Sequence, residues 1–223
     1  MPRRNTIFAN GEYYHIYNRA LNKEPIFVKD HDRRRSILTL SYYRYSNPPT
    51  KLSYLLSFGY DKRKEILDNI QDSEKLVEII TYCLMPNHYH LLLRQLKENG
   101  ISNYIKLFQN SFTRYFNTKN KRKHYLFEGQ FKAVRVEDNE QFLHLHRYIH
   151  LNPYSSFIVK SISELEKYPY SSLPEYLGNQ NNNFCRKEEI LSQFKNIESY
   201  KKFIFDEAGY QRSRKLLEHL VFE

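Results

Sequence analysis

The first part of the chain alternates between a strand pattern and a helix pattern. EYYHIYNR, residues 12–19, is rich in aromatic residues and predicts a first strand. Charged and then apolar residues at helical spacing predict a helix from Asp30 to about Tyr43, and Asn47-Pro48-Pro49 interrupts it. The mixed polar and apolar pattern of residues 51–75 predicts a short helical insertion.

A β-hairpin and a long helix are predicted for the middle of the chain. Residues 76–85 and 88–94 have the composition of strands, and Pro86-Asn87 between them is typical of a tight turn. After Asn99-Gly100, apolar residues recur at the i, i+3, i+4 and i+7 spacing of an amphipathic helix. They are Ile101, Tyr104, Ile105, Phe108, Phe112, Tyr115 and Phe116.

A fourth strand and another helix follow the basic segment KNKRKH, residues 119–124. FKAVRVE, residues 131–137, has the strand pattern. Asp138 and Gln141 have the spacing of a capping box, which opens a helix. We expect Asn152-Pro153 to end that helix, because proline disfavours the helical conformation of the residue before it.

This order of elements predicts an α+β fold of the ferredoxin-like or RRM-like kind. We expect a mainly antiparallel sheet of four to five strands with helices on one face. Glycine and asparagine cluster in LPEYLGNQNNN, residues 173–183, which indicates a boundary. Residues 1–178 are therefore expected to form one domain with an insertion at about 45–75, and residues 179–223 a helical C-terminal extension.

The charge of the chain indicates a class of partner. There are 35 Lys and Arg residues against 25 Asp and Glu, which gives a net charge of +10, together with 20 Tyr and 15 Phe. Basic and aromatic residues interleave in SYYRYS and FTRYFNTKNKRKHY. This combination is typical of proteins that bind nucleic acid, single strands in particular, although a basic surface can also lack any specific partner.

The sequence gives no support for a membrane span, a secretory signal or a disulfide framework. The sequence lacks a run of about 18 apolar residues, so no membrane span is expected, and its start lacks the apolar region of a secretory signal. Cys83 and Cys185 have neither a disulfide-framework nor a metal-ligand spacing. We expect a buried Cys83 and a reducing, cytoplasmic environment.

The segment MPNHYHLLLR, residues 85–94, contains the first candidate for chemistry. In a strand, alternate side chains share a face, so His88 and His90 would point the same way. Two imidazoles on a rigid strand are half of a metal site. The same residues in a solvated turn would have no such role, and the pair alone leaves both interpretations open.

The helix that contains LHLHRYIHLNP contributes a second candidate group. At roughly 100° per residue, Asn152 and His144 each lie about 40° from Tyr148, so the three form one stripe. The core face is expected to consist of Phe142, Leu145 and Ile149. His146 and His150 lie almost opposite Tyr148, and we expect them to be exposed or in contact with phosphate.

Several ordered motifs closely resemble those of a known family. MPNHYHLLL, LFEGQFKAVRVEDNEQ, LHRYIHLNP and YPYSSLPEYLG resemble the single-tyrosine transposases of the His-hydrophobic-His (HUH) endonuclease superfamily. Within that family they look most like the REP-associated tyrosine transposases. YYHIYNRALNKEPIF near the start resembles that family's first strand, so the resemblance covers roughly residues 8–178.

The resemblance implies a role for each candidate residue. His88 and His90 match metal ligands, Tyr148 matches the nucleophile, and Asn152 matches the polar residue that completes the metal site. The implied reaction cleaves and rejoins single-stranded DNA through a 5′-phosphotyrosine with Mg²⁺ or Mn²⁺ as cofactor. The chain departs from the family pattern at Tyr89, which is bulky, and at Ala20, where glycine is more common.

Basic residues near these motifs are together candidates for DNA binding, although for each one alone a solvated surface charge is the more common role. They are Arg19, Lys121, Arg122, Lys123, Lys132, Arg135 and Arg147. The resemblance implies recognition of single-stranded or hairpin DNA by a cytoplasmic, nucleoid-associated protein, as a monomer or homodimer. Residues 184–223 lie outside it.

Two other functions remain open from the sequence. One is a non-catalytic domain that binds single-stranded DNA or RNA through a ferredoxin-like sheet. The other is a zinc-dependent hydrolase, for which no catalytic carboxylate is evident beside the histidines. Catalysis by tyrosine requires that Tyr148 and Asn152 face His88 and His90 across a cleft.

Overall fold

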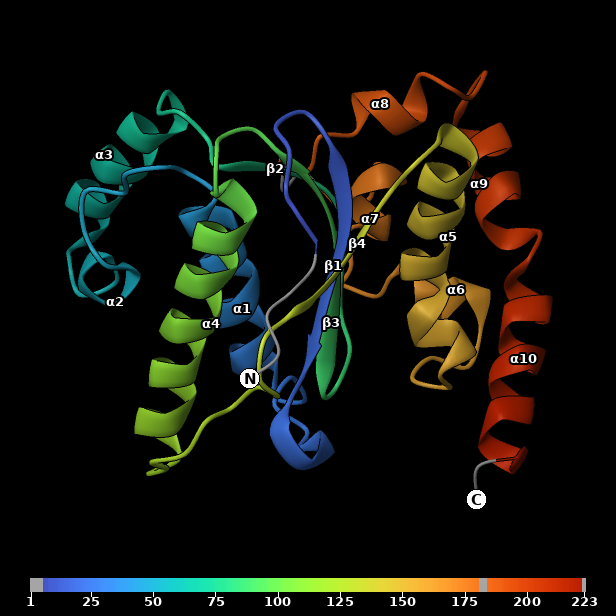
Figure 1. The fold of residues 1–223 in the computed structure, drawn as a ribbon, viewed down its shortest axis with the longest axis horizontal. Helices are drawn as coiled ribbons and strands as arrows, with labels where there is room; N and C mark the ends of the chain where they lie inside the picture. Colours follow the sequence, from blue (N-terminus) through green and yellow to red (C-terminus); the bar gives the residue numbers. More distant parts are fainter. Residues whose placement is uncertain (1–5, 181–183, 222–223) are drawn as a thin grey trace.

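The strands form one antiparallel sheet in the order β2-β3-β1-β4 (Figure 1). The computed structural model describes residues 6–180 and 184–221, with side chains up to residue 216. Parts of the predicted domain (1–5), boundary (181–183) and extension (222–223) lie outside the described residues. The strands are β1 (Tyr13–Arg19), β2 (Val77–Leu84), β3 (His88–Gln95) and β4 (Lys132–Arg135).

The predicted hairpin is confirmed, and it fixes the register of the central strands. Met85 N–H donates to the carbonyl of His88 at 2.9 Å and closes the turn between β2 and β3. β3 then pairs with β1, so that Arg19 lies opposite His88 and Tyr17 opposite His90. The two histidines therefore lie on the sheet at the C-terminal end of β1.

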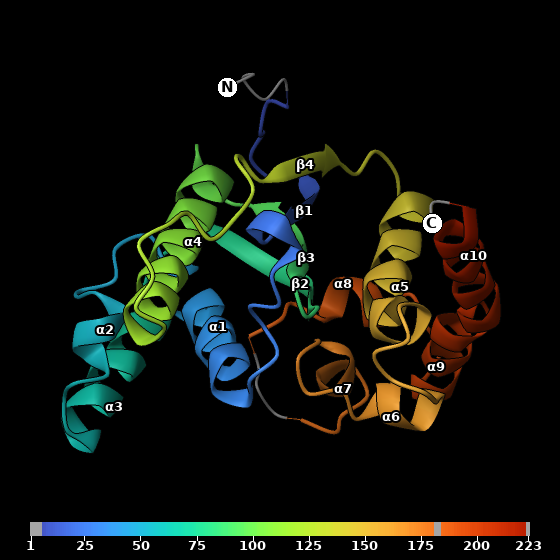
Figure 2. The ribbon, with the colours of Figure 1, turned by 90° about the horizontal axis from the view of Figure 1, so that it is seen from below.

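Helices cover both faces of the sheet. The helices α1 (Asp30–Tyr43) and α4 (Gly100–Lys119) cover one face, and α5 (Asn139–Ser155) lies across the other (Figure 2). The α+β class is confirmed, but the expectation of helices on one face only is wrong. β2 and β3 are buried along almost their whole length, so their side chains need an apolar layer on each side.

The start of α5 agrees with the sequence and its end does not. The Asp138 carboxylate accepts from the N–H of Gln141 at 2.7 Å, and the Gln141 side chain accepts from the N–H of Glu137 at 2.6 Å. The predicted cap is therefore present. The helix continues through Pro153 to Ser155, because Ser156 N–H still reaches the carbonyl of Asn152 at 2.9 Å.

The region after α5 is helical. It contains α6 (Ile162–Glu166), α7 (Leu173–Tyr176), α8 (Glu188–Leu191), α9 (Ile197–Phe205) and α10 (Ala208–Val221). The helices of the predicted C-terminal extension are α8 to α10, whereas α6 and α7 lie before it and were not predicted. The views in Figures 1 and 2 place α9 and α10 on the outer side of α5. This C-terminal region is thus a further layer against α5.

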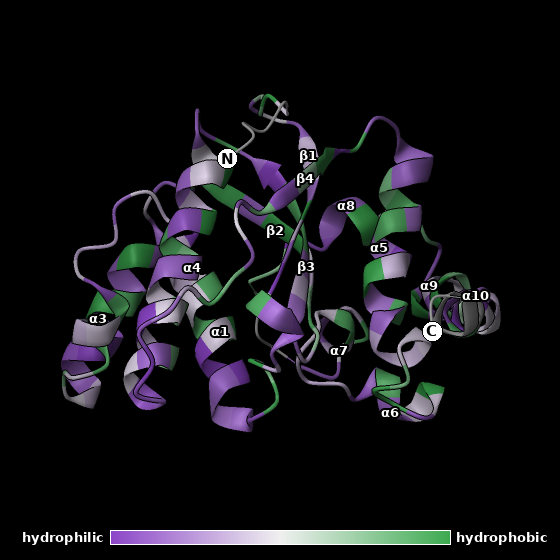
Figure 3. Ribbon diagram, turned by 60° about the horizontal axis from the view of Figure 1, so that its bottom comes forward, coloured by the Kyte–Doolittle hydropathy of each residue, from purple (hydrophilic) through white to green (hydrophobic). Residues whose placement is uncertain are grey.

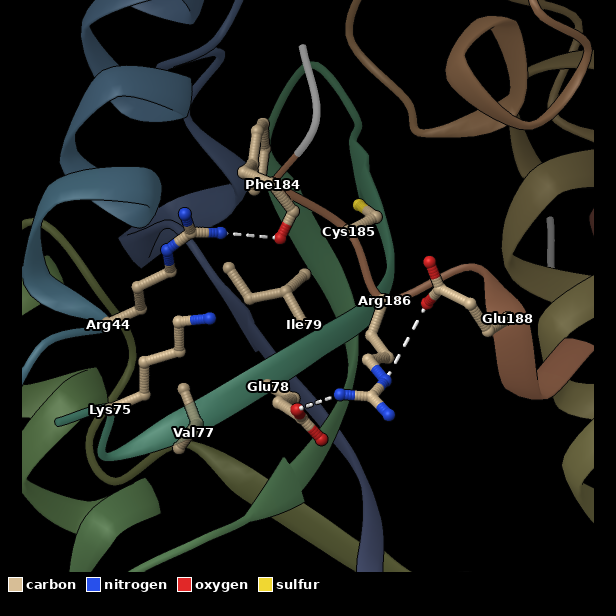
Figure 4. Close-up of a pocket in the computed structure, with 9 residues that line it drawn as sticks. All are labelled: Arg44, Lys75, Val77, Glu78, Ile79, Phe184, Cys185, Arg186 and Glu188. Atoms are coloured by element: carbon tan, nitrogen blue, oxygen red, sulfur yellow. Dashed lines mark hydrogen bonds and ion pairs between the residues drawn. The ribbon is translucent and has the colours of Figure 1, made fainter. Parts of the chain in front are cut away.

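The chain enters this last layer along the edge of β2. Cys185 forms a bridge with Ile79, and the Arg44 guanidinium donates to the carbonyl of Phe184 at 2.6 Å (Figure 4). Arg186 pairs with Glu78 at 3.0 Å. These contacts surround a cavity of about 390 Å³ that contains none of the candidate catalytic residues.

Two helices form the segment expected to be an insertion. They are α2 (Leu52–Leu55) and α3 (Tyr60–Gln71), and a single 3-10 turn, η1 (Leu21–Lys23), follows β1. Figure 3 shows α3 as a mostly hydrophilic helix at the periphery. No helix among the described residues is both long and apolar enough to cross a membrane.

His146 and His150 are buried, so the expectation of exposure or phosphate contact is wrong. Both side chains are 0% exposed. The imidazole of His146 is hydrogen-bonded to Thr81 on β2 at 2.6 Å and to Tyr200 on α9 at 2.9 Å. His150 is hydrogen-bonded to the Ser172 hydroxyl at 2.8 Å. The helical wheel correctly separates them from Tyr148, but that side of α5 is enclosed by β2, α7 and α9.

Burial of His146 predicts a loss of stability in acid. Burial lowers the pKa of His146 to about 3, from an ordinary value of about 6.5. The unfolded chain therefore binds the proton more strongly, and stability falls as pH drops from about 6.5 towards about 3. Between about pH 7.5 and about pH 5 this histidine should account for about 2 kcal/mol of lost unfolding free energy.

Denaturant unfolding at the two pH values tests this prediction. His146→Gln should reduce the difference in unfolding free energy between about pH 7.5 and about pH 5 by about 2 kcal/mol. The control His124→Gln changes an exposed histidine and should leave the difference as in the wild type. An unchanged difference in the His146 variant would contradict the burial of a neutral imidazole.

Candidate active site

β1 and β3 present a row of aromatic and imidazole rings towards α5. His88 and His90 point to this face from β3, and His15 and Tyr17 point to it from β1. The His15 and His90 rings stack with centroids 5.2 Å apart, and Nε2 of His15 is 2.9 Å from Nδ1 of His90. The sheet thus holds three histidines together.

α5 brings Tyr148 against this row. The centroid of the Tyr148 ring lies 5.9 Å from that of His90 and 6.4 Å from that of His15, with the rings nearly perpendicular. Tyr148 and the histidines belong to the same chain. The edge-on packing holds the phenol beside the imidazoles, in the layer between α5 and the sheet.

A cavity of about 270 Å³ lies between these elements. His88 and His90 line it from the sheet, and Tyr148 and Asn152 line it from α5. The four residues whose arrangement the tyrosine mechanism requires therefore share one cavity. Arg19, Lys132, Glu128 and Lys215 also line it, so three cations and one carboxylate surround the rings.

His88 and His90 in the cavity, and His15 beside them, are held in the neutral form. Burial lowers the pKa of His15 to about 4. Burial, together with the charges of Arg19 and Lys215, lowers the pKa of His88 to about 4. The pKa of His90 also lies well below its ordinary value, mainly because the ring is buried. A neutral imidazole has a lone pair available to a metal ion at neutral pH.

Hydrogen bonds decide which nitrogen carries that lone pair. Nδ1 of His88 lies 2.6 Å from the side-chain oxygen of Asn87, which only accepts, so Nδ1 bears the proton and Nε2 the lone pair. Nδ1 of His90 is paired with Nε2 of His15 at 2.9 Å, and the tautomer with the proton on Nδ1 places the lone pair of His90 on Nε2. Such outer partners are typical of metal-binding histidines.

Asn152 supplies the remaining donor on the side of α5. It is 2% exposed, and its side-chain N–H donates to the carbonyl of Tyr148 at 3.0 Å. This hydrogen bond uses the nitrogen and leaves the amide oxygen as an acceptor. Among residues 6–180 and 184–216, no three His, Cys, Asp or Glu side chains form a metal-binding group. A divalent ion here would therefore use two imidazoles and an amide oxygen.

The predicted DNA-binding residues separate into two groups. Arg19 and Lys132 line the cavity. Arg135 lies near the other end of β4 and pairs with Glu12 at 3.0 Å, and Arg147 pairs with Glu207 at 3.5 Å on the outer side of α5. In the basic segment 119–124, Arg122 pairs with Glu24, whereas Lys121 and Lys123 are exposed.

Sequence reasoning missed His15, which packs beside the cavity, and the lining residues Glu128 and Lys215, among others. His15 alternates with Tyr17 in YYHIYNR, so strand pairing with residues 88–90 could have revealed it. Glu128 is the carboxylate that seemed absent beside the histidines, and it lies in the loop before β4. Lys215 comes from α10, far along the chain, and no local pattern indicates that it reaches the cavity.

Comparison with solved structures identifies the fold. A REP-associated tyrosine transposase bound to a REP hairpin matches with a TM-score of 0.55 at 13% identity, over 84% of this chain and 98% of the other. At this identity the match establishes a shared fold. A presumed transposase from Deinococcus radiodurans r1 aligns over 67% of this chain and 95% of its own at 13% identity, with a TM-score of only 0.35. No curated protein matches the sequence.

The sequence itself matches a family model over part of its length. Residues 51–152 match the family model described as IS200-like transposases. This match covers 102 of the 223 residues and supports the resemblance that the motifs indicated. The matched segment extends from α2 to Asn152 and includes His88, His90 and Tyr148, whereas β1 and the helices from α6 to α10 lie outside it.

The protonation of His88 offers a direct test of the cavity. In a metal-free sample its imidazole should titrate with a midpoint of about 4, because burial and two nearby cations disfavour the charged form. At neutral pH the proton should be on Nδ1. Long-range ¹H–¹⁵N correlation spectra distinguish the tautomers, and His88→Gln assigns the signal. A midpoint near the ordinary value of about 6.5 or a proton on Nε2 would contradict the described geometry.

Proposed function

We propose that this chain is a transposase-like endonuclease that cleaves and rejoins single-stranded DNA through a tyrosine–DNA intermediate. One observation carries the proposal: the cavity that contains His88 and His90 also contains Tyr148 and Asn152. The residues proposed as nucleophile and as metal ligands therefore surround one space, and cations adjoin it. The match of residues 51–152 to the IS200-like transposase model supports the same reaction class.

Tyr148 would act as the nucleophile. Its phenol oxygen forms a bond to the scissile phosphorus while the bond from phosphorus to the 3′-oxygen breaks, and the phenol proton ends on the released 3′-OH. The DNA keeps a 5′-phosphotyrosine. Because one phosphoester replaces another, the reverse attack by a 3′-OH rejoins the strand without an external energy source.

His88, His90 and Asn152 would hold a divalent ion, Mg²⁺ or Mn²⁺. Two neutral imidazoles and an amide oxygen, with no thiolate, suit such an ion when phosphate or water oxygens complete its coordination. A bound ion polarises the scissile phosphate and stabilises charge that develops in the transition state. His15 and Asn87 would orient the two imidazoles through their Nδ1 atoms.

The cations of the cavity would bind the phosphates on either side of the reacting bond. Lys132 lies on β4 with its ammonium 5.9 Å from the centre of the Tyr17 ring. Lys215 lines the cavity from α10, close enough to lower the pKa of His88 and His90. A role for Lys215 would make α10 part of the active site rather than a separate appendage.

The substrate would be single-stranded DNA beside a hairpin. A structural relative with the same fold is a REP-associated tyrosine transposase bound to a REP hairpin, and the net charge of +10 suits a DNA partner. Because Tyr148 packs on the histidines of its own chain, a single chain would carry out the cleavage in cis.

A covalent adduct assay tests this function. The protein is incubated with a library of hairpin-bearing single-stranded oligonucleotides and Mg²⁺ or Mn²⁺, and protein–DNA bands are read on a denaturing gel. The wild type should form a band that Tyr148→Phe lacks entirely, because phenylalanine has no nucleophilic oxygen. His88→Gln or His90→Gln should slow its formation at least about 100-fold.

Two tyrosine variants separate adduct formation from DNA binding. Tyr154→Phe removes another phenol of α5, outside the cavity, and should leave the band unchanged. Binding of the same oligonucleotides by Tyr148→Phe should persist. Binding without any adduct in the wild type would favour a non-catalytic nucleic-acid binder. Cleavage without an adduct would favour hydrolysis that depends on Glu128. Either result would overturn the proposal.

A further inference from the structure

A second basic hollow lies on the opposite side of the sheet from Tyr148. It is a groove of about 570 Å³ between α1, α4 and the segment that begins α2. Figures 1 and 2 show these helices together on the face away from α5. We call it the far-face groove. Part of its wall comes from Lys51 and Ser53, at the start of the helical insertion.

The polar part of the far-face groove consists of cations and neutral hydrogen-bonding groups, and Tyr43, Leu107 and Tyr115 form its apolar part. Its four charged lining residues are Arg35, Lys51, Arg114 and Lys119, and no carboxylate is among the described residues that line it. Hydroxyl and amide groups such as those of Ser111 and Asn110 lie between them. A groove of this composition matches a chain of phosphates, which accept from both kinds of group.

Aromatic packing holds part of this charge in place. The Arg35 guanidinium lies 5.2 Å from the centre of the Tyr115 ring, and the Lys119 ammonium lies 5.5 Å from it. The carboxylate of Asp32, buried at one end, pairs with Lys119 and accepts from the Tyr115 hydroxyl at 2.8 Å. Nε of Arg35 is buried without a hydrogen bond to any described residue. The exposed side chains of Lys51 and Arg114 thus remain for an anionic ligand, next to the partly buried guanidinium of Arg35.

A basic segment joins the groove to the catalytic cavity. Lys119 lines the groove and begins the segment KNKRKH. Arg122 then pairs with Glu24, which follows β1. Glu128 N–H donates to the carbonyl of Arg19 at 2.8 Å, and both of these residues line the catalytic cavity. The chain from Lys119 to Glu128 therefore leads from the groove, past the end of β1, to the site of Tyr148.

We propose that the far-face groove is a second DNA-binding site, which holds the sugar-phosphate backbone of DNA that flanks the strand segment in the catalytic cavity. The inference rests on the proposed function for the identity of the ligand as DNA. The groove would select substrates by length, because only DNA long enough to pass around the end of β1 contacts both sites. The cleaved bond itself would depend on the cavity alone.

Charge reversal at two exposed cations tests the groove. Lys51→Glu/Arg114→Glu changes residues at its rim. The control Lys195→Glu/Lys202→Glu changes two exposed lysines in and before α9, so each pair lowers the net charge by four. All variants are made in the Tyr148→Phe background and studied without divalent metal. Binding of hairpin-bearing DNA is measured against salt by fluorescence anisotropy, so the result does not depend on catalysis.

The groove variant should bind DNA of about 30 nucleotides at least about tenfold more weakly, and the slope of log affinity against log salt should fall by about 1.4 for two lost contacts. An oligonucleotide of about 8 nucleotides should bind as before, because it fits one site. The milder Lys51→Gln/Arg114→Gln should show the same pattern with a smaller loss. With Tyr148 restored, adduct formation should fall on the long substrate only.

Equal losses of DNA affinity in the groove variant and the control variant would overturn the inference, because they would reflect net charge alone. Equal losses on long and short DNA would also overturn it. A wild-type protein that binds DNA but forms no adduct would instead count against the proposed catalysis, while the binding data would still decide the role of the groove.

Discussion

The packing of α5 across the sheet is the contact on which the site depends. The edge of the Tyr148 ring lies against the rings of His90 and His15, with centroids 5.9 and 6.4 Å away. On the other side of the same helix, His146 is bonded to Thr81 and Tyr200. Those buried hydrogen bonds tie β2, α5 and α9 together, and they fix the rotation of α5 that presents Tyr148 and Asn152 to the cavity.

Burial away from water keeps His88 and His90 neutral, so that they can donate a lone pair. The helices on both faces exclude water from the sheet, so the imidazoles of the cavity remain neutral while Arg19, Lys132 and Lys215 stand at its margin. Neutral nitrogen donors and nearby cations are the combination that a metal-bound phosphate requires. The same exclusion of water places His146 in the core, where it makes the fold sensitive to acid.

The sequence predicted the parts whose signal is local. Alternation identified the hairpin and put His88 and His90 on one face, and the spacing of Asp138 and Gln141 located the start of α5. The burial of a helix face and the approach of residues from other elements could not be predicted, because they depend on parts of the chain that are far away in the sequence. A helical wheel separates His150 from Tyr148 but cannot say that α7 and α9 enclose it. Glu128 and Lys215 reach the cavity only through the tertiary fold, and no pattern around them indicates it.

The central claim is that one chain builds the whole site from its own sheet and its own α5. Mixing Tyr148→Phe with a His88→Gln/His90→Gln variant tests it most directly, because the first lacks the nucleophile and the second lacks the metal ligands. With an oligonucleotide that forms the adduct with the wild type, the mixture should form no more adduct than either variant alone. Recovery of the adduct would show that Tyr148 acts on the histidines of a partner chain, and it would contradict this account.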